Sequence, residues 1–175
     1  MRNRSRWVRP AAFALLCGLV AAIFILSSQP YRVQTIQPFL QRTLSPEKAE
    51  RMLPHLDIRY DGKPYRRDVN PFGFIELLVR KGAHLLVYAS LAAAAALALG
   101  TFRLRAPAAA ALSLLAVLLV AGLDEWNQRF APGRTPAAAD VAVDLAGGAL
   151  GLALFFASLR LYRLRKKRPV SATPR

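Results

Sequence analysis

Nine residues have side chains whose type and spacing could support ligand binding or proton transfer. Lys81, His84 and Tyr88 are spaced i, i+3 and i+7, so a helix would place them on one face. Carboxylates exchange protons and bind cations, whereas a guanidinium is a planar donor for phosphate or carboxylate groups. We treat these three residues and six further ones as candidate ligand-binding residues and assign none of them a catalytic role: Asp124, Glu125, Gln128, Arg134, Asp140 and Asp144.

A metal site is an alternative interpretation of part of this set. His84, Asp124, Glu125 and Asp144 would together suit a hard or borderline cation. The set contains a single histidine and no HExxH spacing, so we predict neither a metal nor another cofactor. Cys17 is the only cysteine, which excludes an intrachain disulfide and a cysteine metal site.

The segments that must position these residues are strongly apolar. Four stretches contain no Lys, Arg, Asp or Glu: 10–31, 82–102, 106–123 and 145–159. A spanning helix needs about 20 mostly apolar residues, and the last stretch reaches this length when 141–144 is included. We therefore predict an all-α polytopic membrane protein. It forms one domain over 1–175, a four-helix transmembrane bundle with one outer loop of about 45 residues and these approximate spans: 10–27, 80–102, 106–124 and 141–160.

The first apolar stretch has a signal peptide as its alternative. Four arginines within 2–9 resemble a basic n-region. The exit at Ser27, Ser28 and Gln29 lacks a small-x-small cleavage site, so we expect an uncleaved helix.

The formal charge of +15 is distributed around the apolar stretches. Basic residues fill the segments 2–9, 103–105 and 160–168, and none of these segments contains an acid. This pattern is typical of cytoplasmic flanks of spanning helices. We therefore reject a nucleic-acid partner and expect the lipid bilayer as partner, with both termini cytoplasmic in a bacterial plasma membrane. The basic tail is interpreted as a topology anchor, with binding of anionic lipid as the alternative.

The connections carry local signals of their own. Ser45, Pro46 and Glu47 predict a short helix that ends near Leu53. Residues 58–65 read as a hairpin with Asp-Gly as its turn. The loop has too little apolar content for a separate core, so we expect it to lie over the helix ends. Asn70-Pro71 then begins a long helix, and Pro132-Gly133 forms a turn.

Two features concern the orientation of the last two spans. Glu125 neighbours Asp124 and is expected to point away from it, into the outer loop, while Trp126 suits the membrane interface. Gly147 and Gly151 form a small-xxx-small pair that lets another helix approach closely. This pair fits intramolecular packing as well as dimerisation, so the oligomeric state stays open.

Two interpretations of the polar cluster are open. In the first, the cluster holds the bundle together: Lys81 or Arg134 pairs with Asp124 or Asp140, and each interhelical contact contributes about 0.6 kcal/mol. In the second, the cluster lines an outward-facing pocket for a polar ligand, because ionisable residues at membrane depth usually mark function. Outward helix N-termini and Arg134 would favour an anion there. The four acids leave room for a cationic ligand instead.

The order of these residues resembles the VanZ-like family of small membrane proteins. The pattern covers roughly 13–151: Ser27-Ser28-Gln29, Lys81-x-x-His84-x-x-x-Tyr88, Asp124-Glu125-x-x-Gln128, Pro132-Gly133-Arg134, Asp140 and Gly147 to Gly151. At Asp144 the family pattern usually has Asn, so this chain departs from it by a carboxyl group. The resemblance implies a cell-envelope role and, for some members, lowered susceptibility to glycopeptides that carry lipophilic groups.

Three functions compete on this basis. We predict a cell-envelope membrane protein whose outward-facing site binds or shields a surface, lipid-linked or peptidoglycan-related ligand. The alternative is an intramembrane enzyme that acts on a lipid-linked envelope substrate, with His84 or Asp124 as its acid–base group. A small transporter is less favoured, because the sequence shows neither broken helices nor a repeat.

Overall fold

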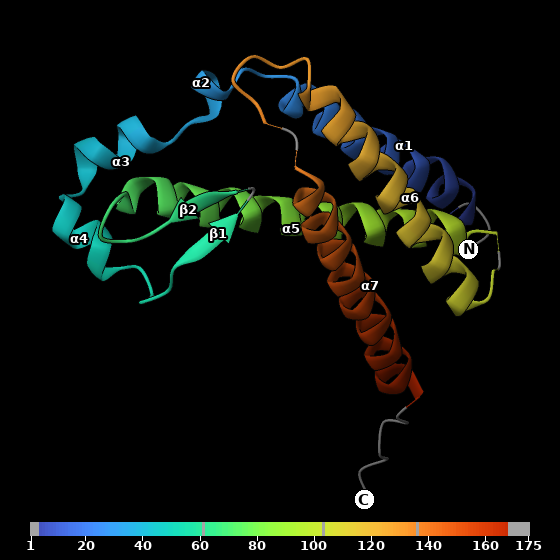
Figure 1. Ribbon diagram of the computed structural model, residues 1–175. Coiled ribbons are helices and arrows are strands. Elements are labelled where there is room, and N and C mark those ends of the chain that lie inside the picture. Colours follow the sequence, from blue (N-terminus) through green and yellow to red (C-terminus); the bar gives the residue numbers. More distant parts are fainter. Residues whose placement is uncertain (1–3, 61, 103, 136, 168–175) are drawn as a thin grey trace, which may run out of the picture.

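The computed structural model describes residues 4–60, 62–102, 104–135 and 137–167. Four of its helices are long and apolar enough to cross a membrane by length and composition: α1, α5, α6 and α7. The chain is therefore an all-α, multi-pass membrane protein, as predicted, with one small hairpin as the only sheet of the described ranges. In chain order (Figure 1) the elements are α1 Arg4–Ser27, α2 Tyr31–Gln34, α3 Gln37–Thr43, α4 Pro46–Arg51, β1 Ile58–Tyr60, β2 Lys63–Tyr65, α5 Pro71–Gly100, α6 Ala106–Gln128 and α7 Ala138–Lys167.

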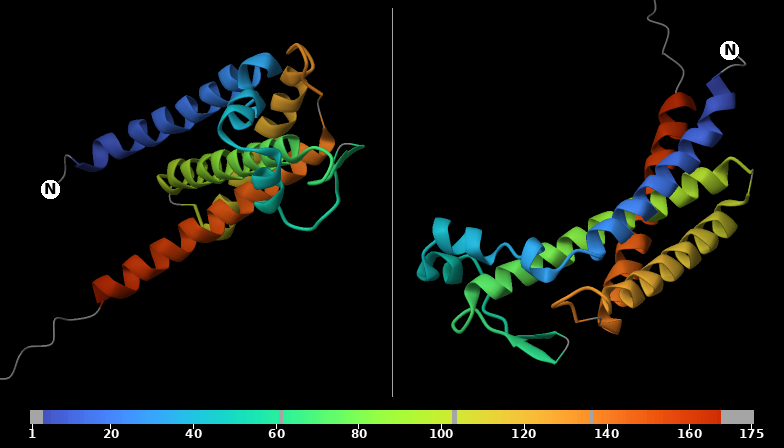
Figure 2. Two further views of the ribbon diagram at one scale, coloured as in Figure 1. Left: turned by 90° about the vertical axis from the view of Figure 1, so that its left-hand side faces the viewer. Right: turned by 90° about the horizontal axis from the view of Figure 1, so that it is seen from above.

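Helix α5 is the centre of the bundle. It contacts α1, α6 and α7, and its contact with α7 is the most extensive of all helix pairs. Figure 2 shows the first turns of α1 and the last turns of α7 at one end of the molecule, where α5 also ends. The short helices α2 to α4 lie at the opposite end, beside the first turns of α5. The start of α1 and the end of α7 thus lie on the same side of the bundle, as four crossings require.

The contact between α5 and α7 depends on two glycines. A Cβ atom at Gly147 would lie 2.6 Å from the carbonyl oxygen of Leu85, and one at Gly151 would collide with the backbone of Ala89. Both contacts are closer than real Cβ atoms allow, so only glycine permits the two helices to approach this closely. The predicted close approach at this pair is confirmed, and the partner helix is α5 of the same chain.

The start of α5 matches the sequence prediction. The Oδ1 of Asn70 accepts a hydrogen bond of 2.9 Å from the backbone N–H of Gly73, and Pro71 occupies the first helical turn. Its 30 residues make α5 about 45 Å long, more than a hydrocarbon core of about 30 Å requires. The polar residues Glu76 and Arg80 mark the N-terminal third as the part that extends beyond the hydrocarbon.

The segment between α1 and α5 covers this polar third. The short helix after Ser45 is confirmed as α4, with the Ser45 side chain accepting from the Lys48 N–H. The hairpin over 58–65 is also confirmed, although Asp61 of its turn lies outside the described residues. Helices α2 and α3 were not predicted, because such short helices depend on tertiary contacts rather than on local propensity.

Candidate functional site

Two polar pairs join α5 to α7 on the N-terminal side of the glycine contact. The Nζ of Lys81 lies 2.6 Å from Oδ1 of Asp140, and the Nδ1 of His84 lies 2.9 Å from Oδ1 of Asp144. Both acids are buried, with 6% of Asp140 and none of Asp144 exposed. Lys81 and His84 of the predicted face therefore contact Asp140 and Asp144 of α7 directly.

A third pair joins α5 to α6. The hydroxyl of Tyr88 donates to Oδ2 of Asp124 over 3.4 Å, and the side-chain amide of Gln128 donates to the same oxygen over 3.1 Å. The rings of His84 and Tyr88 stack with their centroids 6.2 Å apart. The acids of α6 and α7 thus reach one continuous stripe of α5, and the three helices share one polar interior.

Two carboxylate oxygens in this interior have no hydrogen-bond partner among the described residues. They are Oδ1 of Asp124 and Oδ2 of Asp144, and only 2% and 0% of these residues is exposed. A buried acceptor without a partner costs free energy, so such an atom suits a proton or a donor supplied from outside the chain. No cluster of three or more His, Cys, Asp or Glu side chains in the described ranges could hold a metal ion.

Glu125 does not reach the outer loop, so that expectation is wrong. Its Oε2 accepts a hydrogen bond of 2.8 Å from the backbone N–H of Ala137, at the entry to α7, because the side chain turns toward the orphan donors of that helix start. On the same turn, the Asn127 amide donates to the hydroxyls of Ser27 and Ser28 at the end of α1. These residues tie helix ends together, and of them only Ser27 lines one of the two cavities described below.

Arg134 is bound without an acid. Its guanidinium donates to the backbone oxygen of Gln29 over 3.5 Å and to the side-chain oxygen of Gln34, and no described carboxylate lies within ion-pair distance. The turn before it is the predicted one, with Gly133 at φ +76°. Burial, and then the charge of Arg80, lowers the pKa of the Arg134 guanidinium. Among the described residues, Arg134 therefore forms no acid pair that would hold the helices together.

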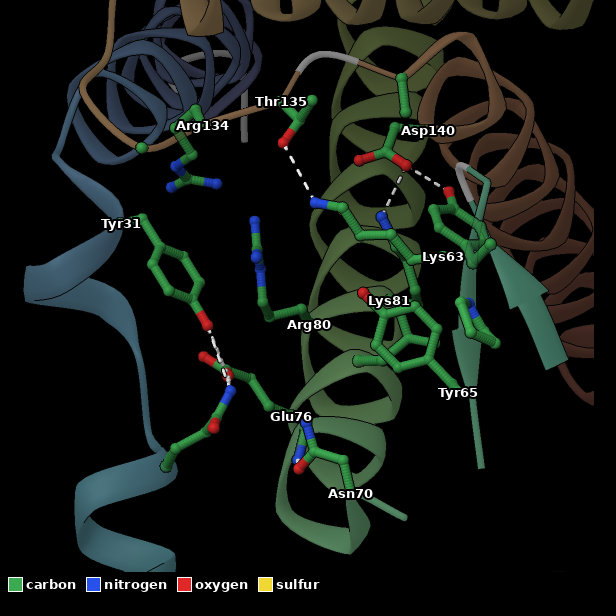
Figure 3. A pocket seen from close by; sticks show the side chains of 17 residues that line it. Tyr31, Lys63, Tyr65, Asn70, Glu76, Arg80, Lys81, Arg134, Thr135 and Asp140 are labelled. Carbon is green, nitrogen blue, oxygen red and sulfur yellow. Dashed lines mark hydrogen bonds and ion pairs between the residues drawn. The ribbon is translucent and has the colours of Figure 1, made fainter. Parts of the chain in front are cut away.

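A polar cavity of about 370 Å³ opens beside the N-terminal third of α5. Figure 3 shows its side chains arriving from α5, from the segment after α1, from the hairpin and from the α6–α7 connection. Three predicted site residues line it, namely Lys81, Arg134 and Asp140. Sequence reasoning missed its other charged and hydroxyl-bearing lining residues: Tyr31, Tyr60, Lys63, Tyr65, Glu76, Arg80 and Thr135.

A second cavity of about 300 Å³ forms a groove between α1, α5 and α6. Ile23, Leu26 and Val87 give this interhelical groove apolar walls, and Ala83 lies at its exposed edge. Leu26 is 54% exposed, so the groove opens on the side of the bundle. Its polar end contains five predicted residues: His84, Tyr88, Asp124, Gln128 and Arg134. Asp144, like Glu125, lines neither cavity.

Arg80 and Arg134 are the side chains common to both cavities. A signal for Arg80 was present, because it precedes His84 by four residues and so belongs to the same helix face. Glu76 lies one further turn upstream and accepts from Tyr31 over 2.9 Å and from Gln37 over 2.6 Å. The face of α5 that lines the cavities is therefore longer than the predicted face and begins outside the apolar stretch.

Tyr60 closes the polar cavity from the hairpin. Its hydroxyl donates to Oδ1 of Asp140, and the Nζ of Lys81 lies 4.3 Å from the centre of its ring. Burial, and then the hydrogen bond to Asp140, raises the pKa of Tyr60, so this phenol remains a donor at neutral pH. The hairpin is thereby fixed against the Lys81–Asp140 pair.

Comparison with known proteins places the chain in a family. No curated protein and no solved structure matches it. Residues 12–161, most of the chain and all of the cluster just described, match the family described as VanZ/LLP1. This protein therefore belongs to the VanZ/LLP1 family.

Proposed function

We propose that the protein binds or shields an amphipathic, lipid-linked ligand of the cell envelope. The ligand's head would occupy the polar cavity, and its apolar chain would lie in the interhelical groove. One observation carries this proposal: Arg80 and Arg134 border both a polar and an apolar cavity. A site whose polar and apolar parts adjoin in this way suits a molecule with the same division.

The position of the two cavities relative to the bilayer supports the proposal. The polar cavity lies beside the part of α5 that exceeds a hydrocarbon core, and the groove begins at the level where α1 and α6 end. A lipid anchored in the bilayer could therefore place its head in the first cavity while its chain stays at membrane depth. Leu26 and Ala83 at the open side of the groove would face lipid.

The orientation is part of the proposal. All ten acids lie between residues 47 and 144, and the helix ends at the terminal side carry only basic residues. Lys and Arg concentrate on the cytoplasmic side of bacterial membrane proteins. We therefore place the termini in the cytoplasm and the polar cavity on the outer face of the plasma membrane. An effect on glycopeptide susceptibility, which the family name suggests, would arise from an envelope lipid bound at that face.

The test is whether a lipid occupies the groove. Native mass spectrometry of the purified full chain should detect bound lipid, and Ala83→Trp should remove it by filling the groove with an indole. Leu86→Trp is the matched control, since Leu86 lies on the same helix, is 71% exposed and lines neither cavity. Equal lipid content in both variants would contradict the proposal.

A second candidate is an intramembrane enzyme acting on the same class of lipid. It is favoured by the pair of His84 with the buried Asp144, and by the neighbouring Asp124, whose Oδ1 has no partner among the described residues. Such groups could exchange protons with a bound substrate. Turnover of an envelope lipid by the purified protein, lost in both His84→Ala and Asp124→Asn, would establish it. If the purified protein binds the lipid but does not turn it over, the enzyme candidate is excluded and the binding function remains.

A further inference from the structure

We propose that the paired guanidinium groups of Arg80 and Arg134 hold a phosphate group, placed where the ligand's head meets its apolar chain. This inference rests on the proposed function and deepens it, because it names the chemical class of the head. It comes from the balance of charge and hydrogen bonds in the polar cavity.

The polar cavity contains more cations than acids. Two carboxylates line it, Glu76 and Asp140, together with four basic side chains: Lys63, Arg80, Lys81 and Arg134. A cavity with excess positive charge and low-dielectric walls concentrates anions. The four acids of the sequence cluster suggested a cationic ligand as an alternative, but only Asp140 of those acids lines this cavity.

Both carboxylates of the cavity are already engaged. Asp140 accepts from Lys81 over 2.6 Å and from the Tyr60 hydroxyl. Glu76 accepts from Tyr31 and Gln37, and also from the backbone N–H of Ile36 over 3.3 Å. Neither acid lies within ion-pair distance of Arg80 or Arg134, so neither arginine forms an ion pair among the described residues.

The two guanidinium groups converge on the same space. Figure 3 shows Arg80 rising from α5 and Arg134 descending from the α6–α7 connection, with their charged ends turned toward one another. Within the described ranges Arg134 bonds to oxygens of Gln29 and Gln34, while Arg80 lies over the ring of Tyr31 with its Cζ 5.6 Å from the centroid. Their mutual repulsion contributes to the lowered pKa of Arg134. An anion between them would relieve this repulsion.

Phosphate fits this arrangement better than a carboxylate. One planar guanidinium can satisfy a carboxylate through two parallel hydrogen bonds, whereas two guanidinium groups from different elements surround a tetrahedral anion. Lys63, which donates to the Thr135 hydroxyl over 3.5 Å, lines the same cavity and could contact further phosphate oxygens. Because the arginines also border the groove, the phosphate would sit at the junction with an apolar chain.

Three probes separate the possible sources of the anion. A lysophosphatidic acid and a monoacylglycerol with the same acyl chain differ only by the phosphate, and inorganic phosphate lacks the chain. Affinities would be measured with the purified full chain in a neutral detergent. We expect lysophosphatidic acid to bind at least about tenfold more tightly than the monoacylglycerol, since hydrogen bonds to charged groups are worth that much.

The variants assign the effect to the arginines. Arg80→Gln and Arg134→Gln should each weaken lysophosphatidic acid about 10- to 100-fold and leave the monoacylglycerol unchanged. Arg59→Gln, which removes an exposed charge outside both cavities, is the matched control and should change neither affinity. Arg80→Lys and Arg134→Lys keep the positive charge but lose the planar guanidinium. They therefore test the need for paired hydrogen bonds if a glutamine variant does not fold.

The outcomes distinguish the two levels of the proposal. Equal affinity for the two lipids, or arginine variants no weaker than Arg59→Gln, would overturn the phosphate assignment, while loss of both lipids in Ala83→Trp would still support a lipid site. If inorganic phosphate binds as tightly as lysophosphatidic acid and Ala83→Trp affects neither, the anion site stands and the lipid-linked function falls.

Discussion

The ammonium group of Lys81 lies 2.6 Å from the carboxylate of Asp140, and this pair joins two helices that run in the same direction. The pair is mostly withdrawn from water, with side-chain exposures of 18% for Lys81 and 8% for Asp140. The helix-holding interpretation paired Lys81 or Arg134 with Asp124 or Asp140, and Lys81–Asp140 is the pair found among the described residues. The polar residues thus divide into pairs that join α5 to α6 and α7, and two arginines, Arg80 and Arg134, that form no ion pair with a described acid.

Breaking this pair should destabilise the fold. Lys81→Met leaves the buried Asp140 with the Tyr60 hydroxyl as its one side-chain donor among the described residues. It should cost roughly 2 kcal/mol, less than breaking a fully buried pair, because Lys81 is partly exposed. Unfolding of the purified protein in mixed micelles would measure the loss. The double variant Lys81→Met with Asp140→Leu should recover part of it, and strictly additive losses would contradict direct coupling.

Much of this arrangement could be predicted from the sequence, and the reason lies in helix periodicity. The spacing of Lys81, His84 and Tyr88 fixes a face, and Gly147 with Gly151 fixes where another helix can approach. Tyr60 could not be placed, because its contact with Asp140 joins residues 80 positions apart through a loop. Arg80 shares the face of His84, but it lies just outside the apolar stretch 82–102 and was not included among the candidate residues.

The glycine contact between α5 and α7 predicts a sharp dependence on side-chain size. Gly151→Leu should prevent stable accumulation of the protein, because its side chain would have to enter the backbone of Ala89. Gly151→Ala should fold less stably than the parent, which shows whether the effect is graded. Ala153→Leu, at an exposed position of the same helix, is the control. The melting temperatures of the three variants and the parent would be compared in detergent. Parent-like stability of Gly151→Leu would show that the helices do not pack this closely.

The orientation across the membrane can be tested by thiol labelling in a Cys17→Ala background. Arg59→Cys in the hairpin should react with a membrane-impermeant reagent in intact spheroplasts, whereas Arg165→Cys should react only after lysis. Both positions are exposed, which makes Arg59 a better reporter than the half-buried Tyr60 beside it. The reverse labelling pattern would place the polar cavity in the cytoplasm and refute an outward-facing site.

Arg134 separates ligand binding from helix packing most directly. Its guanidinium donates to two neutral oxygens, of Gln29 and Gln34, and no described acid depends on it for charge compensation. Arg134→Ala should therefore cost about 1 kcal/mol, the worth of an ordinary hydrogen bond and well below the loss in Lys81→Met. Melting temperatures of the two variants, measured in the same detergent, check this order.

The same variant should nevertheless lose the ligand, because the partner of Arg80 at the junction of the two cavities is gone. Arg134→Lys should restore charge but little binding, since an ammonium group cannot make two parallel hydrogen bonds to one phosphate. Bound-lipid mass spectra of the three proteins provide the readout. Stability that falls as far as in Lys81→Met would mean that Arg134 holds helices together. Unchanged lipid binding in Arg134→Ala would remove this residue from the site, because it would show that the bound lipid does not depend on the Arg134 guanidinium.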